Sequence, residues 1–529
     1  MSVLNVFFRN PEFVRLLRSK LRLKSAFLLA VLAVLIFGVI LLGMYYDLTN
    51  GYGRTTAEQM LRHYFFTVTG IQLGIVTFFG LSQAVQVITV EREKRTYDFQ
   101  RLVAMGPGRV ALGKLLGGPC QAWWLALCAL PFACVPVMGQ AITAGAFVES
   151  QLIIFVFGLT VSAGGLLFSS LFEKTSQASG VLVLFILVMF SGSGLLMALS
   201  FASAGSATLD LAATASPVTM LARLSETSTP GSLRASTVSF LGCSVPAIWG
   251  FLFLHLLSLA FVYPIIVRRI LDPELSFLAP RHAVLAFAVF QAVILLGCWD
   301  LFHLDPHAGL VAFHAANALA LVLLPFGLFP SGDLLRGRLF RGAKNEHWRI
   351  FFEKTGVLQD SPPMRLVCGL AAAYVLEAAV LTIYLDVGYR AVGWLAALAV
   401  TVMIACTSIA MASVLLSLLL YIERRGLGAG LFALALALSL PQCVVALLAY
   451  TWDYSILVSP IAYLAELRQL LRGNPLTEDL QKTLSCPLIC VVLAVACSVL
   501  AVLRIRFLLD MRELERRREA EANSEQKPA

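Results

Sequence analysis

The 529-residue sequence carries too little charge for a water-soluble protein. Hydrophobic residues make up 59% of it and charged residues 13%, whereas soluble domains carry about 25% charged residues. The net charge of +9 does not indicate nucleic-acid binding, because the basic residues lie in short tracts between apolar runs. These features predict an all-α integral membrane protein and exclude a soluble globular domain and a nucleic-acid partner.

Residues 1–24 predict an amphipathic helix that lies on the inner membrane surface. Asn10 suits the N-cap, Pro11 the first helical position, and Glu12 the positive end of the helix dipole. Apolar residues follow at helical spacing with basic residues beside them: Phe13, Leu16, Leu17 and Leu21, with Arg15, Arg18, Arg22 and Lys24. The simpler alternative is a basic flank of the first membrane span.

Twelve apolar segments are long enough to cross a hydrocarbon core, which takes about 20 helical residues. In chain order they cover residues 25–46, 64–90, 119–139, 147–172, 178–202, 241–267, 282–299, 309–329, 366–385, 391–421, 427–450 and 482–503. With the N-terminus in the cytoplasm, alternating spans leave 32 of the 40 Lys and Arg residues on the cytoplasmic side. This bias predicts a multi-pass protein of the cell (inner) membrane with both termini cytoplasmic.

A short repeat divides the spans into two groups of six. Ser216-Pro217 precedes the sixth span and Ser459-Pro460 precedes the twelfth, each followed by a similar apolar pattern. The pattern predicts a 6+6 parallel repeat, because an even number of spans gives both halves the same orientation. The predicted organisation is a first half at 25–267, a linker at 268–281, a second half at 282–503 and a charged tail at 504–529.

The loop after the second span, residues 91–116, contains the most informative pattern. It begins Glu91-Arg92-Glu93-Lys94-Arg95-Thr96, passes Leu102, breaks at Gly106-Pro107-Gly108-Arg109, and continues as Leu112-Gly113-Lys114-Leu115-Leu116. Its charged start and helical period predict a cytoplasmic helix that contacts a soluble partner. The tract resembles the signature of the ABC type-2 (ABC-2) transporter permeases, which reads Glu-Arg-Glu-x-Gly-Thr and then Leu, a Pro turn and Leu-Gly-Lys-Leu-Leu.

The resemblance implies a permease subunit without ATPase motifs, and so not an enzyme, that functions as an exporter with a separate cytoplasmic ATP-binding subunit, in two copies. The helix at 91–103 would transmit the partner's motion through Glu91, Arg92, Glu93, Thr96 and Leu102, and ATP and Mg²⁺ would be bound by the partner. The first half, through about residue 270, resembles the family well. The second half diverges, since its corresponding tract at 331–365 has no Glu-Arg-Glu run. Arg95 also stands where the family usually has Gly.

Other patterns have weaker functional meaning. Gly108 to Lys114 has the spacing of a phosphate-binding loop, but Leu115 replaces the required hydroxyl residue and no strand precedes it. Glu377 is a carboxylate in the middle of the ninth span, and it indicates either a functional polar site or a hydrogen bond between helices. The eleven cysteines lie in or beside apolar runs and predict packing residues, and no metal or cofactor site is predicted.

Two other classes of protein remain as alternatives. A secondary, ion-coupled transporter of the major facilitator type also has twelve spans in a 6+6 repeat, but it needs an ionisable network where only Glu377 stands. A membrane-embedded enzyme needs a catalytic cluster near one interface, and the sequence contains none.

Overall fold

The computed structural model describes residues 10–49, 56–97, 105–171, 214–227, 237–240, 243–271, 278–304 and 363–389, with scattered helical residues between 306 and 328, 398 and 409, and 492 and 507. The chain divides into two compact units, Met1–Pro273 and Glu274–Ala529. The predicted spans at 178–202 and 427–450, the tract at 331–362 and the Ser459-Pro460 pair lie outside the described residues.

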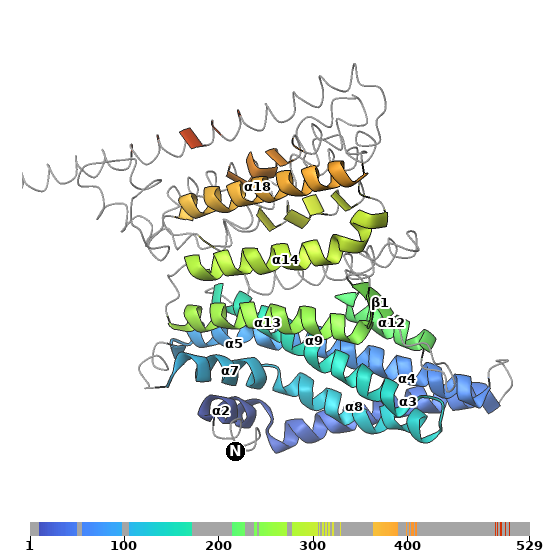
Figure 1. The fold of residues 1–529 in the computed structure, drawn as a ribbon. Helices are drawn as coiled ribbons and strands as arrows, with labels where there is room; N and C mark the ends of the chain where they lie inside the picture. Colours follow the sequence, from blue (N-terminus) through green and yellow to red (C-terminus); the bar gives the residue numbers. More distant parts are fainter. Residues whose placement is uncertain are drawn as a thin grey trace, which may run out of the picture. The chain divides into compact units, whose positions relative to one another are not determined.

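The first unit is built from helices and one hairpin (Figure 1). In order these are α2 (Pro11–Lys20), α3 (Leu23–Thr49), α4 (Ala57–Gly74), η1 (Ile75–Gly80), α5 (Leu81–Glu93), α7 (Pro107–Gly117), α8 (Cys120–Met138), α9 (Ala144–Leu171), α12 (Pro217–Thr227), β1 (Thr237–Phe240), β2 (Cys243–Pro246) and α13 (Ala247–Leu271). The described helices of the second unit are α14 (Pro280–Leu304) and α18 (Pro363–Tyr389).

Seven described helices are long and apolar enough to cross a membrane. They confirm spans one to four, six, seven and nine of the sequence analysis, with boundaries that differ by a few residues. Span two was predicted to begin at residue 64 and begins at Ala57, and span six was predicted to begin at residue 241. Residues 237–240 and 243–246 instead form an antiparallel hairpin in which Val238 pairs with Val245, and the helix begins at Ala247.

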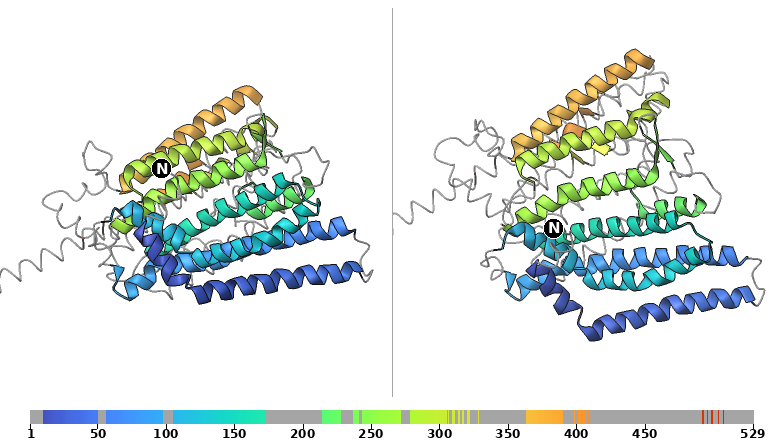
Figure 2. Two further views of the ribbon diagram at one scale, coloured as in Figure 1. Left: turned by 90° about the horizontal axis from the view of Figure 1, so that it is seen from below. Right: turned by 60° about the horizontal axis from the view of Figure 1, so that its bottom comes forward.

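Helix α9 lies at the centre of the first unit, between α5 and α13 (Figure 2). At one end of the bundle, α5, α7, α9 and α13 share an apolar cluster that includes Ile88, Ala111, Leu166 and Ile266. Helices α3, α4 and α8 share a second cluster around Phe37, Tyr64 and Ala129. The short helix α2 packs mainly against α7.

The second span contains a π-helical segment. α4, η1 and α5 form one continuous helix of 37 residues, Ala57–Glu93, and η1 contributes six residues in which the backbone bonds are of the i to i+5 type. The π segment shifts the face that α5 presents relative to the face of α4. The wider turn thus sets the direction in which the end of α5 points its charged residues.

The Ser-Pro pair of the first half marks a helix start. Pro217 occupies the first position of α12, and the carbonyl of Ser216 accepts a hydrogen bond from the backbone N–H of Met220 at 3.1 Å. Proline at this position is favoured because its missing N–H would be unpaired in any case. The pair therefore has a local structural role, and the proposed repeat stays a prediction.

Candidate functional site

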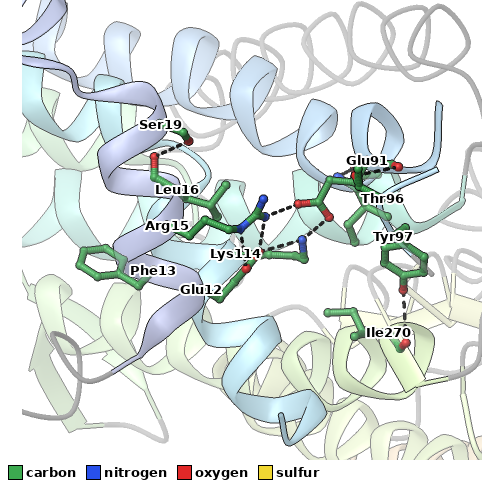
Figure 3. A network of polar contacts seen from close by, with 12 residues as sticks. Glu12, Phe13, Arg15, Leu16, Ser19, Glu91, Thr96, Tyr97, Lys114 and Ile270 are labelled. Atoms are coloured by element: carbon green, nitrogen blue, oxygen red, sulfur yellow. Dashed lines mark hydrogen bonds and ion pairs between the residues drawn. The ribbon is translucent and has the colours of Figure 1, made fainter. Parts of the chain in front are cut away.

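Three tracts that are distant in the sequence meet at one place in the first unit: α2, the end of α5, and α7 (Figure 3). They contain the Asn-Pro-Glu, Glu-Arg-Glu and Leu-Gly-Lys patterns of the sequence analysis. We call the four charged residues at their junction, Glu12, Arg15, Glu91 and Lys114, the ion cluster.

Helix α2 begins where the sequence predicts and is fixed to α7 at its N-cap. The side chain of Asn10 accepts hydrogen bonds from the backbone N–H groups of Glu12 and Phe13 at 3.1 and 3.4 Å. The same side chain donates to the carbonyl of Arg109 at 2.7 Å. Asn10 therefore caps α2 and joins it to the first turn of α7.

Two glycines on α7 let α2 approach closely. A Cβ atom at Gly113 would lie 2.8 Å from the Cβ of Glu12, and one at Gly117 would lie 3.0 Å from the Cβ of Leu16. The first distance is shorter than real Cβ atoms tolerate and the second is tighter than most real contacts, so a larger residue at Gly113 would displace α2 and one at Gly117 would require Leu16 to shift. Because the two glycines are four residues apart on α7, they form one small-residue face for α2.

The ion cluster is enclosed by this contact. The ammonium group of Lys114 is fully buried and contacts Glu12 at 3.0 Å and also Glu91. The guanidinium group of Arg15 binds Glu12 at 2.8 Å and also Glu91, while about half of its side chain stays exposed. Two acids and two bases balance, which is the arrangement that buried charges require. The cluster links all three helices.

The pKa of Glu12 reflects its two basic partners. Burial alone would raise the pKa of this carboxyl group, but hydrogen bonds from Arg15 and Lys114 and their positive charges outweigh burial. The pKa of Glu12 is therefore below its usual value, and the group is ionised at neutral pH. The pKa of Arg15 is raised by its hydrogen bond to Glu12 in the same way.

The structure interrupts the predicted helix at 91–103. α5 ends at Glu93, and the chain turns through Lys94 and Arg95 before Tyr97. The backbone N–H of Thr96 bonds to the carbonyl of Glu91 at 2.9 Å, and that of Arg95 bonds to the carbonyl of Arg92 at 3.0 Å. This pair of bonds is the Schellman motif that ends many helices, and it requires a left-handed residue at the position of Arg95. Arg95 has a φ of 54°.

The motif gives a physical reason for the glycine that the ABC-2 signature has at this position. Glycine adopts positive φ without steric cost, whereas a side chain there is strained. The Glu-Arg-Glu-x-Gly-Thr pattern is therefore a charged last turn of a helix followed by its termination signal. The prediction of one helix over residues 91–103 was wrong at this point, because charge and periodicity alone do not show where a helix stops.

The predicted coupling residues fall into two groups. Glu91 is buried in the ion cluster, whereas Glu93 and Thr96 are exposed and Arg92 is partly exposed, with its guanidinium 5.2 Å from the centre of the Tyr97 ring. Leu102 lies outside the described residues. We call the exposed turn Glu93–Thr96 the elbow.

Helix α13 is joined to the same region by two tyrosines. The hydroxyl of Tyr97 donates to the carbonyl of Ile270 at 3.2 Å, and the hydroxyl of Tyr263 donates to the carbonyl of Gly108 at 2.8 Å. Both bonds fasten segments beside the elbow to a membrane span. Neither tyrosine was predicted from the sequence as part of this site, and Glu12, Arg15 and Lys114 were not predicted as partners of Glu91. For Lys114, the available signal in the sequence was its place in the Leu-Gly-Lys-Leu-Leu pattern.

Lys114 does not lie in a phosphate-binding loop. Residues from Gly108 to Leu115 all belong to helix α7, which follows a turn, and the lysine points into the ion cluster. The resemblance of this stretch to a nucleotide-binding loop therefore stops at its spacing.

Buried polar groups also meet within the second unit. A ring nitrogen of His314 lies 2.7 Å from the hydroxyl of Tyr374 on α18, and the amide of Gln291 on α14 donates to Asn317. Glu377, the predicted intramembrane polar residue, is partly buried on α18, one turn after Tyr374. A function for Glu377 stays a prediction. The hydrogen bonds of Gln291 and Tyr374 were not predicted from the sequence.

Comparison with known proteins identifies the first half of the chain. Residues 10–223 match the family model described as ABC-2 type transporter. The match begins at Asn10 and contains every residue of the ion cluster and the elbow. Neither a curated protein nor a solved structure matches the chain significantly.

Proposed function

Residues 10–223 belong to the ABC-2 type transporter family, and from this premise we propose that the chain is the membrane-spanning permease subunit of an ABC exporter. A separate cytoplasmic ATP-binding subunit drives it, in two copies, and binds the ATP and Mg²⁺. The twelve spans, the 6+6 repeat and the cytoplasmic position of both termini, which the basic residues favour, are part of the proposal.

The observation that supports this proposal most directly is that the ion cluster holds the turn of α5 that precedes the exposed elbow. The elbow presents Glu93, Lys94, Arg95 and Thr96 to solvent, and the ion cluster holds the preceding turn of α5 between α2 and α7. A soluble partner that moves the elbow would therefore move α2, α5 and α7 as one piece.

The two tyrosine contacts extend this path to a span. Tyr97 and Tyr263 join the region to α13, and α13 packs along α9. In the proposed mechanism, closure of the ATPase subunits displaces the elbow, and the displacement reaches α5 directly and α9 through α13. Glu91 acts as a positioning residue, and Glu93 and its exposed neighbours contact the ATPase.

The structure suggests a matched pair of charge reversals as the test. Glu93 and Glu58 are exposed glutamates at the two ends of the same continuous helix. Glu93→Lys is expected to abolish co-purification with the ATPase and stimulation of its activity, while Glu58→Lys leaves both intact. Membrane insertion of both variants is checked by their yield in the membrane fraction.

The opposite result, with coupling intact in Glu93→Lys and lost in Glu58→Lys, would refute the elbow as the contact. Transport by purified vesicles in the absence of ATP would instead support a secondary transporter. Glu91→Lys is unsuitable for this test, because it would place a third base in the ion cluster and disturb folding as well as docking.

A further inference from the structure

The basic residues around the junction of α2 and α3 differ in their contacts. Arg15 belongs to the ion cluster, and the ammonium group of Lys20 donates to the carbonyl of Gly118 at 2.6 Å, where burial lowers the pKa of Lys20. Arg18, Arg22 and Lys24 are exposed and form no ion pair with any described residue. Three positive charges within seven positions thus lack a protein counter-charge in the described part of the chain.

The most exposed apolar side chains of the junction lie directly beside these charges. Leu23 is 90% exposed, Phe27 71% and Leu28 69%. They begin the first membrane span, so the basic residues stand where a hydrocarbon surface starts. The indole N–H of Trp124 donates to the carbonyl of Ala26 at 2.9 Å, and tryptophan with a polar partner is characteristic of the membrane–water interface.

The junction is held in a fixed geometry. The amide of Gln121 donates to the carbonyl of Lys20 at 2.9 Å, and the hydroxyl of Ser25 lies within hydrogen-bond distance of the carbonyls of Lys20 and Arg22. The Gln121 bond fastens the junction to the start of α8, the Lys20–Gly118 contact fastens it to the end of α7, and the Ser25 bonds hold the turn itself. The binding of a ligand to the exposed bases would therefore cost the protein backbone little conformational freedom.

We propose that this junction, formed by Arg18, Arg22, Lys24, Leu23 and Phe27, is a binding site for an anionic phospholipid. Guanidinium groups bind phosphate oxygens through two parallel hydrogen bonds, and the lysine adds a point charge. The acyl chains would lie along Leu23 and Phe27. Each base near an anionic surface strengthens binding by a factor of about five.

A lipid fits this surface better than a soluble protein does. The exposed charged and apolar residues follow one another within residues 18–28, which matches a phosphate headgroup joined to acyl chains. A soluble partner could pair with the bases, but it could not cover side chains that begin a membrane span. A zwitterionic lipid supplies no net negative charge to balance the three bases.

The test uses the purified full-length chain in detergent, titrated with phosphatidylglycerol or phosphatidylcholine and followed by native mass spectrometry. In the triple variant Arg18→Gln, Arg22→Gln, Lys24→Gln, the preference for phosphatidylglycerol over phosphatidylcholine is expected to fall by a factor of about ten or more. The charge-conserving variant Arg18→Lys, Arg22→Lys, Lys24→Arg should retain most of it. The matched control Lys94→Gln, Arg95→Gln, Arg109→Gln removes three exposed bases elsewhere and should bind as the unmodified chain does.

Three results would contradict the proposal. The first is equal binding of both lipids by the unmodified chain, and the second is an equal loss of phosphatidylglycerol binding in the triple variant and its matched control. The third is a triple variant that still binds phosphatidylglycerol but no longer co-purifies with the ATPase. The last result would assign the surface to the protein partner. If the triple variant does not fold, Lys24→Gln alone must show a loss of about fivefold, and added salt must weaken phosphatidylglycerol binding to the unmodified chain.

Discussion

Lys114 shows how strongly a single residue depends on its neighbours in this fold. Its ammonium group has no exposure to water and is neutralised by Glu12 and Glu91. Removal of one member of a buried ion pair leaves an uncompensated charge, which typically costs about 3–5 kcal/mol. The identity of the residue matters less than the balance of charge around it.

Lys114→Met is therefore expected to destabilise the protein strongly, seen as a large fall in Tm in detergent. The exchange Glu91→Lys with Lys114→Glu keeps the balance of charge and should recover part of the loss. Arg109→Met, which removes an exposed base of the same helix, serves as the control. An unchanged Tm in Lys114→Met would contradict the assigned role of the cluster.

Substitution of Arg95, unlike that of Lys114, is expected to stabilise the folded protein. Its φ of 54° costs a non-glycine residue roughly 1 kcal/mol. Arg95→Gly is expected to raise the free energy of unfolding by about 0.5–1 kcal/mol, after allowance for the greater freedom of glycine in the unfolded chain. Thermal unfolding of the purified chain measures the effect. Lys94→Gly, at a neighbouring position with a φ of -82°, should destabilise instead.

Glu12 makes the docking of α2 sensitive to acid. Its pKa in the folded protein is below the usual 4.5, so its contribution to stability is complete above that pH. The contribution is lost as the pH falls through the lower, folded-state pKa. Tm should fall more steeply below about pH 4.5 in the unmodified chain than in Glu12→Gln, which has no such group to titrate. Parallel curves for the two proteins would show that Glu12 does not contribute.

At the scale of elements, the contact between α2 and α7 depends on small residues. Gly113→Ala would place a Cβ 2.8 Å from that of Glu12 and is expected to push α2 away and open the ion cluster. Proteolysis near α2 should become faster and Tm should fall. Gly70→Ala provides the control, because a Cβ there meets nothing within 4 Å. Equal behaviour of the two variants would show that close approach is not required.

The sequence predicts these elements better than it predicts their contacts. Apolar length located seven spans, and the Asn10-Pro11 pair gave the start of α2, because both signals are local. The hairpin before α13 was missed because its apolar residues, such as Val238, Phe240 and Val245, run on into the span that follows. The partners of Glu91 were missed because Lys114 and Arg15 are brought to it only by tertiary packing. The polar contacts of His314 and Gln291 in the second unit were missed for the same reason.

At the scale of the whole molecule, the family match covers residues 10–223 of a chain of 529. The match and the ion cluster both belong to the first unit, while the second unit contributes further helices suited to a membrane. A chain with twelve spans would place both of its ends on the same side of the membrane. The orientation of the ends is thus the simplest property that depends on the complete count of spans.

Epitope tags at the two termini are expected to be digested together when protease is added to inside-out vesicles, and protected together in right-side-out vesicles. A tag inserted between Gly139 and Thr143, in the turn between α8 and α9, should show the reverse accessibility. Opposite behaviour of the two terminal tags would mean an odd number of spans and would exclude the parallel repeat.

The π-helical segment Ile75–Gly80 has a consequence for how this chain can change in length. Each residue of an α-helix advances the direction of its side chains by about 100°, and the wide turn of η1 supplies such an offset in the middle of the second span. The wide turn holds one residue more than the same stretch of α-helix, so loss of one residue between Ile75 and Gly80 would leave a regular helix in which Glu91 still faces Lys114 and Arg15. Insertion of one further residue, with no second wide turn to hold it, would instead rotate the end of α5 by about 100° and turn Glu91 away from both partners. The second span is therefore expected to tolerate a shortening by one residue at η1 but not a lengthening there.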